Sequence, residues 1–207
     1  MDNYRRALIY ARELFLQWDQ AKIIARCGLR ADDEYIHIAF LGRPYRIRRS
    51  DGRVDCIDDG VREADFSEAL TIYDYICRSE PMPGLSGRLL PVNGLRHAAR
   101  SSSPNDSSFH QKSADYLQQH QAALAIALQK IGLAPFPQGD AACMFALFDG
   151  FTAVFQFWAG DEEFPPSVRF LWDENTPDYL KYETVYYAMG CFLARLEEII
   201  ADIERNC

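Results

Sequence analysis

Three adjacent carboxylates, Asp161, Glu162 and Glu163, mark the segment of the sequence with the most evident potential for chemistry. Crowded carboxylates repel one another, so the first hypothesis is a site in which a hard metal cation or an amine offsets their charge. A second hypothesis is a raised carboxyl pKa, which would suit Asp161 or Glu163 to acid–base chemistry. A third interpretation is a solvated turn in which one of these side chains caps backbone amides.

Two further carboxylates, Asp173 and Glu183, follow the acidic turn in the chain. The aromatic runs that end at Trp158 and begin near Val168 predict two strands on either side of this turn. If these strands pair, Asp161 and Asp173 lie at opposite ends of the second strand, about 17 Å apart at ~3.3 Å per residue. We therefore treat the acidic turn and the pair of Asp173 and Glu183 as separate candidates.

Aromatic side chains beside the acidic turn predict a ligand pocket. Trp158, Phe164 and Trp172 would form its walls, and the carboxylates would orient a cationic or metal-bearing ligand. The sequence thus predicts a cytoplasmic binding or accessory protein with a small-molecule or cation pocket, and it identifies neither the ligand nor a cofactor. The alternative is an acid–base or divalent-cation-dependent enzyme that uses Asp161 or Glu163. The candidate ligand-binding residues are Trp158, Asp161, Glu162, Glu163, Phe164, Trp172, Asp173 and Glu183.

A second concentration of charge lies on a predicted group of strands nearer the N-terminus. Its forked guanidinium groups suit phosphate or carboxylate ligands. The other interpretation is a solvated sheet face whose arginines are balanced by nearby aspartates. The arginines are Arg43, Arg46, Arg48, Arg49 and Arg53, and the aspartates are Asp51, Asp55, Asp58 and Asp59.

Sequence motifs for common cofactors and nucleophiles are absent. The histidines at positions 37, 97, 110 and 120 form no metal-ligand spacing with one another or with cysteine, so we expect no structural zinc site. No lysine and serine or threonine follow Gly84 and Gly87 as a phosphate-binding loop requires, and no nucleophile-elbow motif is present.

Composition limits the classes of partner. The formal net charge of −8 argues against general nucleic-acid binding, which needs a basic surface. No apolar run approaches the ~20 residues of a membrane helix, and the N-terminal segment has no secretory signal, so we expect no membrane partner and a cytoplasmic location. In that reducing compartment the six cysteines are expected to be free thiols. The oligomeric state is not predicted.

Hydrophobic periodicity predicts the elements of the first half of the chain. Apolar residues at helical spacing from Tyr4 to Trp18 indicate an amphipathic helix, and a short helix from Asp19 to Cys27 should stop at Gly28. Alternating residues from Tyr35 to Cys56 then indicate a three-stranded antiparallel meander with one solvated face. Asp65 and Glu68 form a capping pattern before a further helix that ends near Pro81.

The second half is predicted to contain a short strand near Leu89, a helix from Ser113 to Ile131, and a central hairpin. This hairpin joins Cys143–Phe148 to Phe151–Trp158 through Asp149-Gly150, for which a type I′ turn is expected. A third strand covers Val168–Trp172. Thr176 is then expected to cap a long final helix with Pro177 at its first position.

The order of elements predicts the fold class. Strands come in hairpins and not in strand–helix–strand units, which indicates an α+β fold with antiparallel sheets packed by N-terminal, central and C-terminal helices. We expect residues 1–207 to form a single α+β domain with a mobile serine-rich loop near 97–112, because that segment offers little apolar surface to bury.

Several of these segments together resemble an uncharacterised prokaryotic family, domain of unknown function 3786. The most specific part is the D-E-E-F-P run at Asp161–Pro165, and the likeness covers most of the chain. The family is common in anaerobes and some members look joined to iron–sulfur modules, whereas this chain has no such cysteine cluster and departs from the family pattern at Arg88–Gly94. The resemblance implies the extent of the fold and the place of the site but no activity. The other similar segments are Phe40–Tyr45, Ser50–Val54, Leu70–Tyr75, Pro83–Gly87, Phe170–Asp173 and Tyr179–Glu183.

Overall fold

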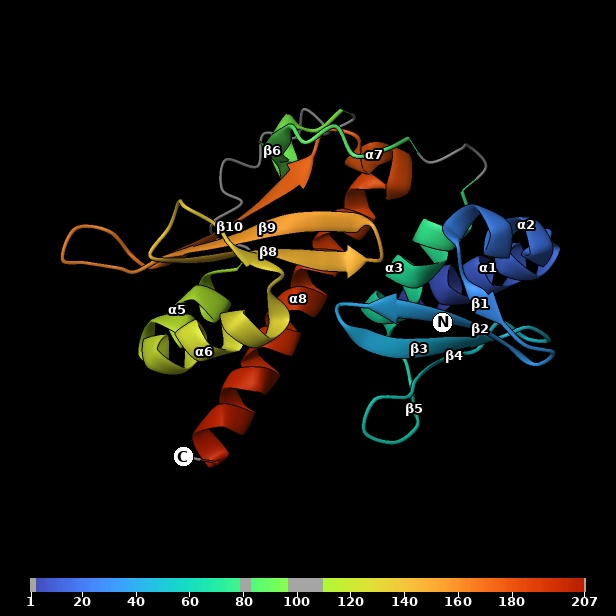
Figure 1. Cartoon of the computed structure of the whole chain (residues 1–207), viewed down its shortest axis with the longest axis horizontal. Helices are drawn as coiled ribbons and strands as arrows, with labels where there is room; N and C mark the ends of the chain where they lie inside the picture. Colours follow the sequence, from blue (N-terminus) through green and yellow to red (C-terminus); the bar gives the residue numbers. More distant parts are fainter. Residues whose placement is uncertain (1–2, 79–82, 97–109, 207) are drawn as a thin grey trace.

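The computed structural model describes residues 3–78, 83–96 and 110–206, and these residues form an α+β fold with two antiparallel sheets (Figure 1). The helices are α1 (Asn3–Gln17), α2 (Gln20–Cys27), α3 (Phe66–Ile76), α5 (Gln111–Gln119), α6 (Gln121–Ile131), α7 (Thr176–Tyr179) and α8 (Tyr182–Arg205), with a 3₁₀ turn at Val92–Gly94. The predicted loop near 97–112 lies mainly outside the described residues, and α5 already begins at Gln111.

The first sheet is a five-stranded meander in the order β1-β2-β3-β4-β5. Along β2 every second residue is buried, as the alternation in the sequence predicts. The expected three strands are confirmed and gain a two-residue strand at each edge. The strands are β1 (Arg30–Ala31), β2 (Tyr35–Phe40), β3 (Arg43–Arg48), β4 (Val54–Cys56) and β5 (Arg62–Glu63).

The second sheet has the order β6-β10-β9-β8-β7, which puts the predicted hairpin at its centre. Strand β9 is buried along most of its length on both faces. The expected pairing of β9 with β10 is confirmed, with Trp158 opposite Ser167 and Ala153 opposite Trp172. The strands are β6 (Leu89–Pro91), β7 (Ala134–Pro135), β8 (Ala141–Phe148), β9 (Phe151–Trp158) and β10 (Ser167–Asp173).

The turn of the central hairpin differs from the prediction. A type I′ turn needs positive φ at both central residues. At Asp149-Gly150 only the glycine has it, with φ of 75°, and β8 instead carries an irregularity just before the turn. Positive φ at both positions occurs at Leu41-Gly42, with values of 50° and 73°. The unusual Leu41 backbone is held because its side chain is buried and its N–H donates to Leu147 O at 3.0 Å.

Two predicted helices are interrupted. The helix expected from Ser113 to Ile131 is broken at His120, whose φ of −121° and ψ of 32° are not helical, although Leu117 and Leu124 are buried on both sides of the break. The final helix begins at Tyr182 and not at Pro177, because Leu180 is extended after the single turn of α7. The capping pattern at Asp65 is confirmed as a full capping box.

Helix α8 connects the two halves of the structure (Figure 1). It packs against α3 on one side and α6 on the other, and Phe192 inserts its ring among Phe145, Phe155 and Phe170 of the second sheet. The sheets also meet directly, since the Phe40 and Phe148 ring centroids are 5.2 Å apart. The buried apolar side chains therefore form one continuous cluster that includes both sheets.

Candidate functional site

The acidic turn is a compact loop, here called the acidic loop and defined as Ala159–Pro166, between β9 and β10. Its fold is organised by Asp161, whose Oδ1 accepts hydrogen bonds from the backbone N–H groups of Phe164 at 2.8 Å and Glu163 at 2.9 Å. The same two bonds hold the pKa of Asp161 below its ordinary value. Asp161 therefore caps backbone amides, as the third interpretation of the sequence proposed.

The acidic loop is held to the rest of the molecule through its two ends. Gly160 donates its N–H to Gln118 Oε1 at 3.0 Å, and Gln111 Nε2 donates to Pro166 O at 3.1 Å. Both glutamines belong to α5. A side chain at position 160 would bring its Cβ to within 2.7 Å of Pro166, so only glycine fits there. The loop is thus fixed by its own residue types and by α5.

The tip of the acidic loop faces solvent. Asp161, Glu162 and Glu163 are exposed, and the Phe164 side chain is 67 % exposed. In Figure 1 the orange segment between β9 and β10 extends beyond the helices at one end of the molecule. Trp158 at the foot of the loop is half-buried, and the Arg169 guanidinium lies 5.2 Å from its ring centre.

The opposite end of β10 holds the other predicted carboxylate, Asp173, which is only 2 % exposed. Its carboxylate accepts backbone N–H groups from Gly87 at 2.7 Å, Asn175 at 2.9 Å and Ser86 at 3.1 Å, and the Ser86 hydroxyl at 3.2 Å. Burial acts to raise the pKa of Asp173, but these donors outweigh burial and keep the pKa below its ordinary value. Asp173 therefore joins two segments far apart in the sequence.

The predicted site residues fall into separate places. Trp158, Phe164 and the three acidic-turn residues share one end of the second sheet. Trp172 is fully buried beside Asp173 at the other end, so Phe164 and Trp172 do not wall a common cavity. Glu183 is exposed in the first turn of α8, where it lines a different pocket with residues of α1 and α3.

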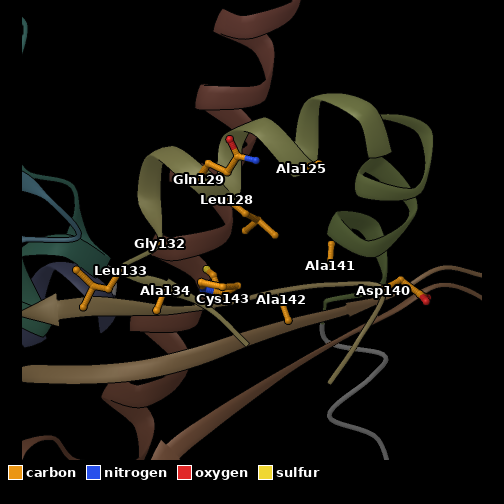
Figure 2. Close-up of a pocket in the computed structure, with 11 residues that line it drawn as sticks. Ala125, Leu128, Gln129, Gly132, Leu133, Ala134, Asp140, Ala141, Ala142 and Cys143 are labelled. Atoms are coloured by element: carbon orange, nitrogen blue, oxygen red, sulfur yellow. The ribbon is translucent and has the colours of Figure 1, made fainter. Parts of the chain in front are cut away.

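A groove of about 460 Å³ lies between α6 and the β7–β8 edge of the second sheet (Figure 2). Leu128 points into it from α6, while Ala142 and Cys143 lie below on β8. Burial raises the pKa of the Cys143 thiol to about 12, so this side chain is neutral and acts as apolar surface. The lining residues are Ala125, Leu128, Gln129, Gly132, Leu133, Ala134, Pro135, Asp140, Ala141, Ala142 and Cys143.

Gly132 lies where the end of α6 is close to β8 in this groove. A Cβ at this position would lie 2.6 Å from Leu128 O and 2.9 Å from the Cys143 Cβ. Contacts this short are not tolerated, so a side chain here would push the end of α6 away from the strand. The shape of the groove therefore depends on glycine at position 132.

Asp140 connects the groove to the acidic loop. It lies at one end of the groove, and its Oδ2 accepts the N–H of Ala159, the first residue of the acidic loop, at 2.7 Å. Its own N–H donates to Phe157 O at 2.9 Å. One carboxylate oxygen of the groove thus holds the foot of the loop that carries Asp161, Glu162 and Glu163.

Four of the five predicted arginines pair with carboxylates, and the fifth, Arg49, bonds to Gln20 and to the Asp32 backbone oxygen. Arg53 and Arg46 lie 2.7 and 3.6 Å from opposite oxygens of Asp55, which is buried. Arg48 lies 3.1 Å from Asp51, and Arg43 pairs with Asp58 at 3.1 Å and with a glutamate of α8. This arrangement favours the interpretation of a charge-balanced sheet face over that of an anion site.

Glu68 of α3 is buried and belongs to a network with Arg62, which is exposed, and Tyr45 of the first sheet. It accepts two bonds from Arg62, both at 2.7 Å, and one from the Tyr45 hydroxyl at 2.6 Å. Burial acts to raise the pKa of Glu68, but Arg62 and Tyr45 lower it below its ordinary value. The network lines a cavity of about 130 Å³, and its charged atoms are already paired with one another.

Two features are absent from the described residues, a metal-binding cluster and a membrane-spanning helix. Within residues 3–78, 83–96 and 110–206, no three or more histidine, cysteine, aspartate or glutamate side chains are grouped so as to hold a metal ion. In the same part of the chain, no helix has both the length and the apolar character needed to cross a bilayer. The five described cysteines are present as thiols.

Comparison with known families identifies the relatives of this chain. Residues 19–195 match the family described as Domain of unknown function (DUF3786). The chain belongs to this family. No curated protein and no solved structure matches the chain. The match covers the acidic loop, the groove and the Asp173 cluster, and confirms the resemblance noted in the sequence.

The family description names no activity. The residues that form the groove, above all Gly132 and Asp140, were not recognised from the sequence. Gly132 reads only as a helix stop, and Asp140 as part of a turn. The one available signal was the run of small residues in α6 and at Ala141-Ala142, which leaves space where the two segments meet.

Proposed function

We propose that this DUF3786 protein is a binding or accessory module that holds a small, mainly apolar organic molecule in the groove between α6 and β8, beside the acidic loop. The observation that carries the proposal is a groove of about 460 Å³ that ends at Asp140, the residue bonded to the foot of the acidic loop. Its volume falls within the range of ordinary ligand pockets, about 300–1,000 Å³.

The lining favours an apolar ligand body. Leu128, Leu133 and Cys143 contribute apolar surface, and the alanines leave room beside them. Each Å² of apolar surface that a ligand removes from water contributes about 25 cal/mol. Polar side chains in the groove are limited to Gln129 and Asp140, which is the pattern of a pocket that orients its ligand through few polar contacts.

The charges near one end favour a ligand whose polar end is neutral or cationic. Asp140 lies at that end, and the acidic loop joined to it carries three more carboxylates. An anionic end would be repelled by these groups, since the protein as a whole also has a formal net charge of −8. We therefore include the acidic loop in the ligand's environment. We also retain the cytoplasmic location predicted from the sequence.

The enzymatic alternative at Asp161 or Glu163 receives less support from the geometry. A general base is most effective when its pKa lies near the working pH. The backbone bonds from Phe164 and Glu163 move the pKa of Asp161 in the opposite direction. A cation site beside the acidic loop stays a prediction, and a thermal-shift screen of divalent cations with the Asp161→Asn/Glu162→Gln/Glu163→Gln variant would test it.

A pair of variants on α6 tests the groove. Ala125 lines the groove and Ala122 does not, although both are exposed on the same helix. Ala125→Phe should fill the groove, and Ala122→Phe adds the same ring outside it. With the neutral apolar fluorophore 6-propionyl-2-(dimethylamino)naphthalene as probe, we expect Ala125→Phe to weaken binding at least about tenfold, which corresponds to about 1.4 kcal/mol.

Methyl NMR spectra locate the probe. Binding in the groove should shift the methyl signals of Leu128 and Leu133, and should leave those of Leu14 and Leu70, which line another pocket, in place. Equal affinity of the two phenylalanine variants, or shifts confined to Leu14 and Leu70, would overturn the proposal.

A further inference from the structure

We propose that a second pocket, between α1, α3 and α8, binds an organic ammonium ion that carries an apolar chain. This pocket has a volume of about 240 Å³ and contains one of the predicted ligand residues, Glu183. Residues of all three helices line it: Ala7, Tyr10, Ala11, Leu14, Leu70, Tyr73, Asp74, Cys77, Lys181, Glu183, Thr184 and Tyr187.

The walls of this pocket suit an apolar chain next to a cation. Leu14 and Leu70 offer aliphatic surface, and three tyrosines contribute aromatic rings, of which Tyr10 is 65 % exposed. Aromatic faces attract ammonium groups through their negative π surface. A ligand could therefore bury its chain against the leucines and keep its charged end near the rings.

A buried carboxylate supplies the charged partner. Asp74 is 8 % exposed, and its Oδ2 accepts the backbone N–H of Lys181 at 2.6 Å. The Lys181 ammonium lies 3.4 Å from Oδ1 of the same carboxylate. An ammonium group is thus already accommodated beside Asp74. The Lys181 side chain is 61 % exposed, so its ammonium group can move into solvent when the ammonium group of a ligand takes its place beside Asp74.

Glu183 adds a carboxylate that the fold does not use. Its side chain is exposed in the first turn of α8, and the hydrogen bonds and ion pairs of the described residues do not include it. Asp74 and Glu183 together with Lys181 give the pocket two negative charges and one positive charge, a net charge of −1. This balance selects a cationic ligand over a carboxylate or phosphate.

This inference is independent of the proposed function, because the two pockets share no residue and use different helices. The groove beside the acidic loop is recognised mainly by its apolar surface. The pocket at α1 is recognised by the pairing of an ammonium group with Asp74 and Glu183. Either site can fail in experiment while the other is retained.

Calorimetric titration with three probes of equal chain length tests the inference: n-hexylamine, n-hexanol and hexanoate. We expect saturable binding of n-hexylamine, binding of n-hexanol at least about tenfold weaker, and no binding of hexanoate, since a charged hydrogen bond is worth more than a tenfold change in affinity. Equal affinity for the amine and the alcohol, or no saturable binding of the amine, would overturn the inference.

Substitutions of Asp74, Lys181 and Glu183 test whether these side chains bind n-hexylamine. Asp74→Asn keeps an oxygen to accept the Lys181 N–H and should reduce n-hexylamine affinity about tenfold. Lys181→Gln removes the competing ammonium group and should increase the affinity, an effect that a purely structural role for Asp74 does not predict. If Asp74→Asn does not fold, the readout is Glu183→Gln, which should weaken binding.

The matched control is Glu13→Gln, which neutralises an exposed carboxylate on α1 that does not line the pocket. We expect wild-type affinity for this variant. Unchanged affinity in both Asp74→Asn and Glu183→Gln, or an equal loss in the control, would contradict the assignment.

Discussion

The two ends of strand β10 use the same chemistry for different purposes. At each end an aspartate accepts backbone N–H groups, and at each end these bonds lower the pKa of the carboxyl. Asp161 is exposed and organises only its own loop. Asp173 is buried and joins β10 to residues 86 and 87, which belong to a segment far away in the sequence. One aspartate is thus a local cap and the other a link in the fold.

The two ends of β10 differ in how many of their side-chain groups remain free to contact a ligand. The donors around Asp173 occupy both of its carboxylate oxygens, so it has little capacity for a ligand. At the acidic loop, Asp161 alone forms the turn, and the side chains of Glu162, Glu163 and Phe164 remain exposed. Within the acidic loop, Asp161 therefore stabilises the turn, whereas Glu162 and Glu163 remain free to contact a ligand.

Removal of Asp173 should have the largest effect on stability. Asp173→Ala removes a buried carboxylate that accepts the N–H groups of Ser86, Gly87 and Asn175, and each hydrogen bond to a charged group contributes about 1.5–3 kcal/mol. We expect a loss of at least about 3 kcal/mol in urea unfolding at pH 7. A loss no larger than that of Asp161→Ala would show that the two ends do not differ as described.

The free energy of unfolding at acidic pH should also depend on Asp173. The pKa of Asp173 is lower in the folded state than in the unfolded state, where an aspartate titrates near about 3.9. Its contribution is therefore complete above that pH and is lost as the pH falls through the folded-state pKa. Asp173→Asn should flatten the dependence of stability on pH below about 4 and leave the slope above about 5 unchanged. An unaltered acid slope would contradict the lowered pKa.

Substitution of Gly132 should have the next largest effect. Gly132→Ala places a Cβ against Leu128 O and Cys143, and we expect a loss of about 2 kcal/mol from overpacking. Gly190, which lies within α8, is the matched control, because a Cβ at this position would have no atom within 4 Å. Gly190→Ala should increase stability by about 0.5–1 kcal/mol through its higher helix propensity. Equal effects of the two substitutions in urea unfolding would argue against the tight approach of α6 to β8.

The Asp161 cap should contribute less than either of these positions. Asp161→Ala removes the acceptor of two exposed backbone N–H groups, which water can still satisfy, so we expect a modest fall in Tm. Asp161→Asn keeps an acceptor oxygen and should be closer to wild type. In a thermal melt, a Tm that is lowest for Asp161→Ala, intermediate for Asp161→Asn and highest for the wild type would support the capping role. The reverse order of Tm values would refute it.

Neutralisation of the two loop glutamates should have the smallest effect. Glu162→Gln/Glu163→Gln removes exposed like charges that neither fold the loop nor pair with a described side chain, so we expect an unchanged or slightly raised Tm. Far-ultraviolet circular dichroism should be unchanged. A marked fall in Tm would show that these glutamates have a structural role, and the comparison between the two ends of β10 would lose its basis.

Local rules allowed much of the fold to be predicted. The capping box at Asp65, the helix stop at Gly28 and the pairing of β9 with β10 all follow from residues close in sequence. The break at His120 was not predictable, because Leu117 and Leu124 keep the same apolar face on both sides of it. The positive φ of Leu41 depends on a bond to Leu147 in the other sheet, which no local pattern reveals.

The candidate site was predictable only in part. The sequence pointed to the acidic turn, and Asp161 does shape that loop. The groove depends on contact between the end of α6 and β8, and its polar end depends on a bond between Asp140 and Ala159. These contacts join segments that are separate in the sequence, so residue types and spacing alone did not reveal them.

The most direct test of the proposed groove is native mass spectrometry of the protein purified from the cells that produce it. The wild type, Ala125→Phe and Ala122→Phe should be prepared side by side without added ligand. The account predicts a bound small molecule on the wild type and on Ala122→Phe that is lost or strongly reduced on Ala125→Phe. The same bound mass on all three proteins, or none on the wild type, would contradict it.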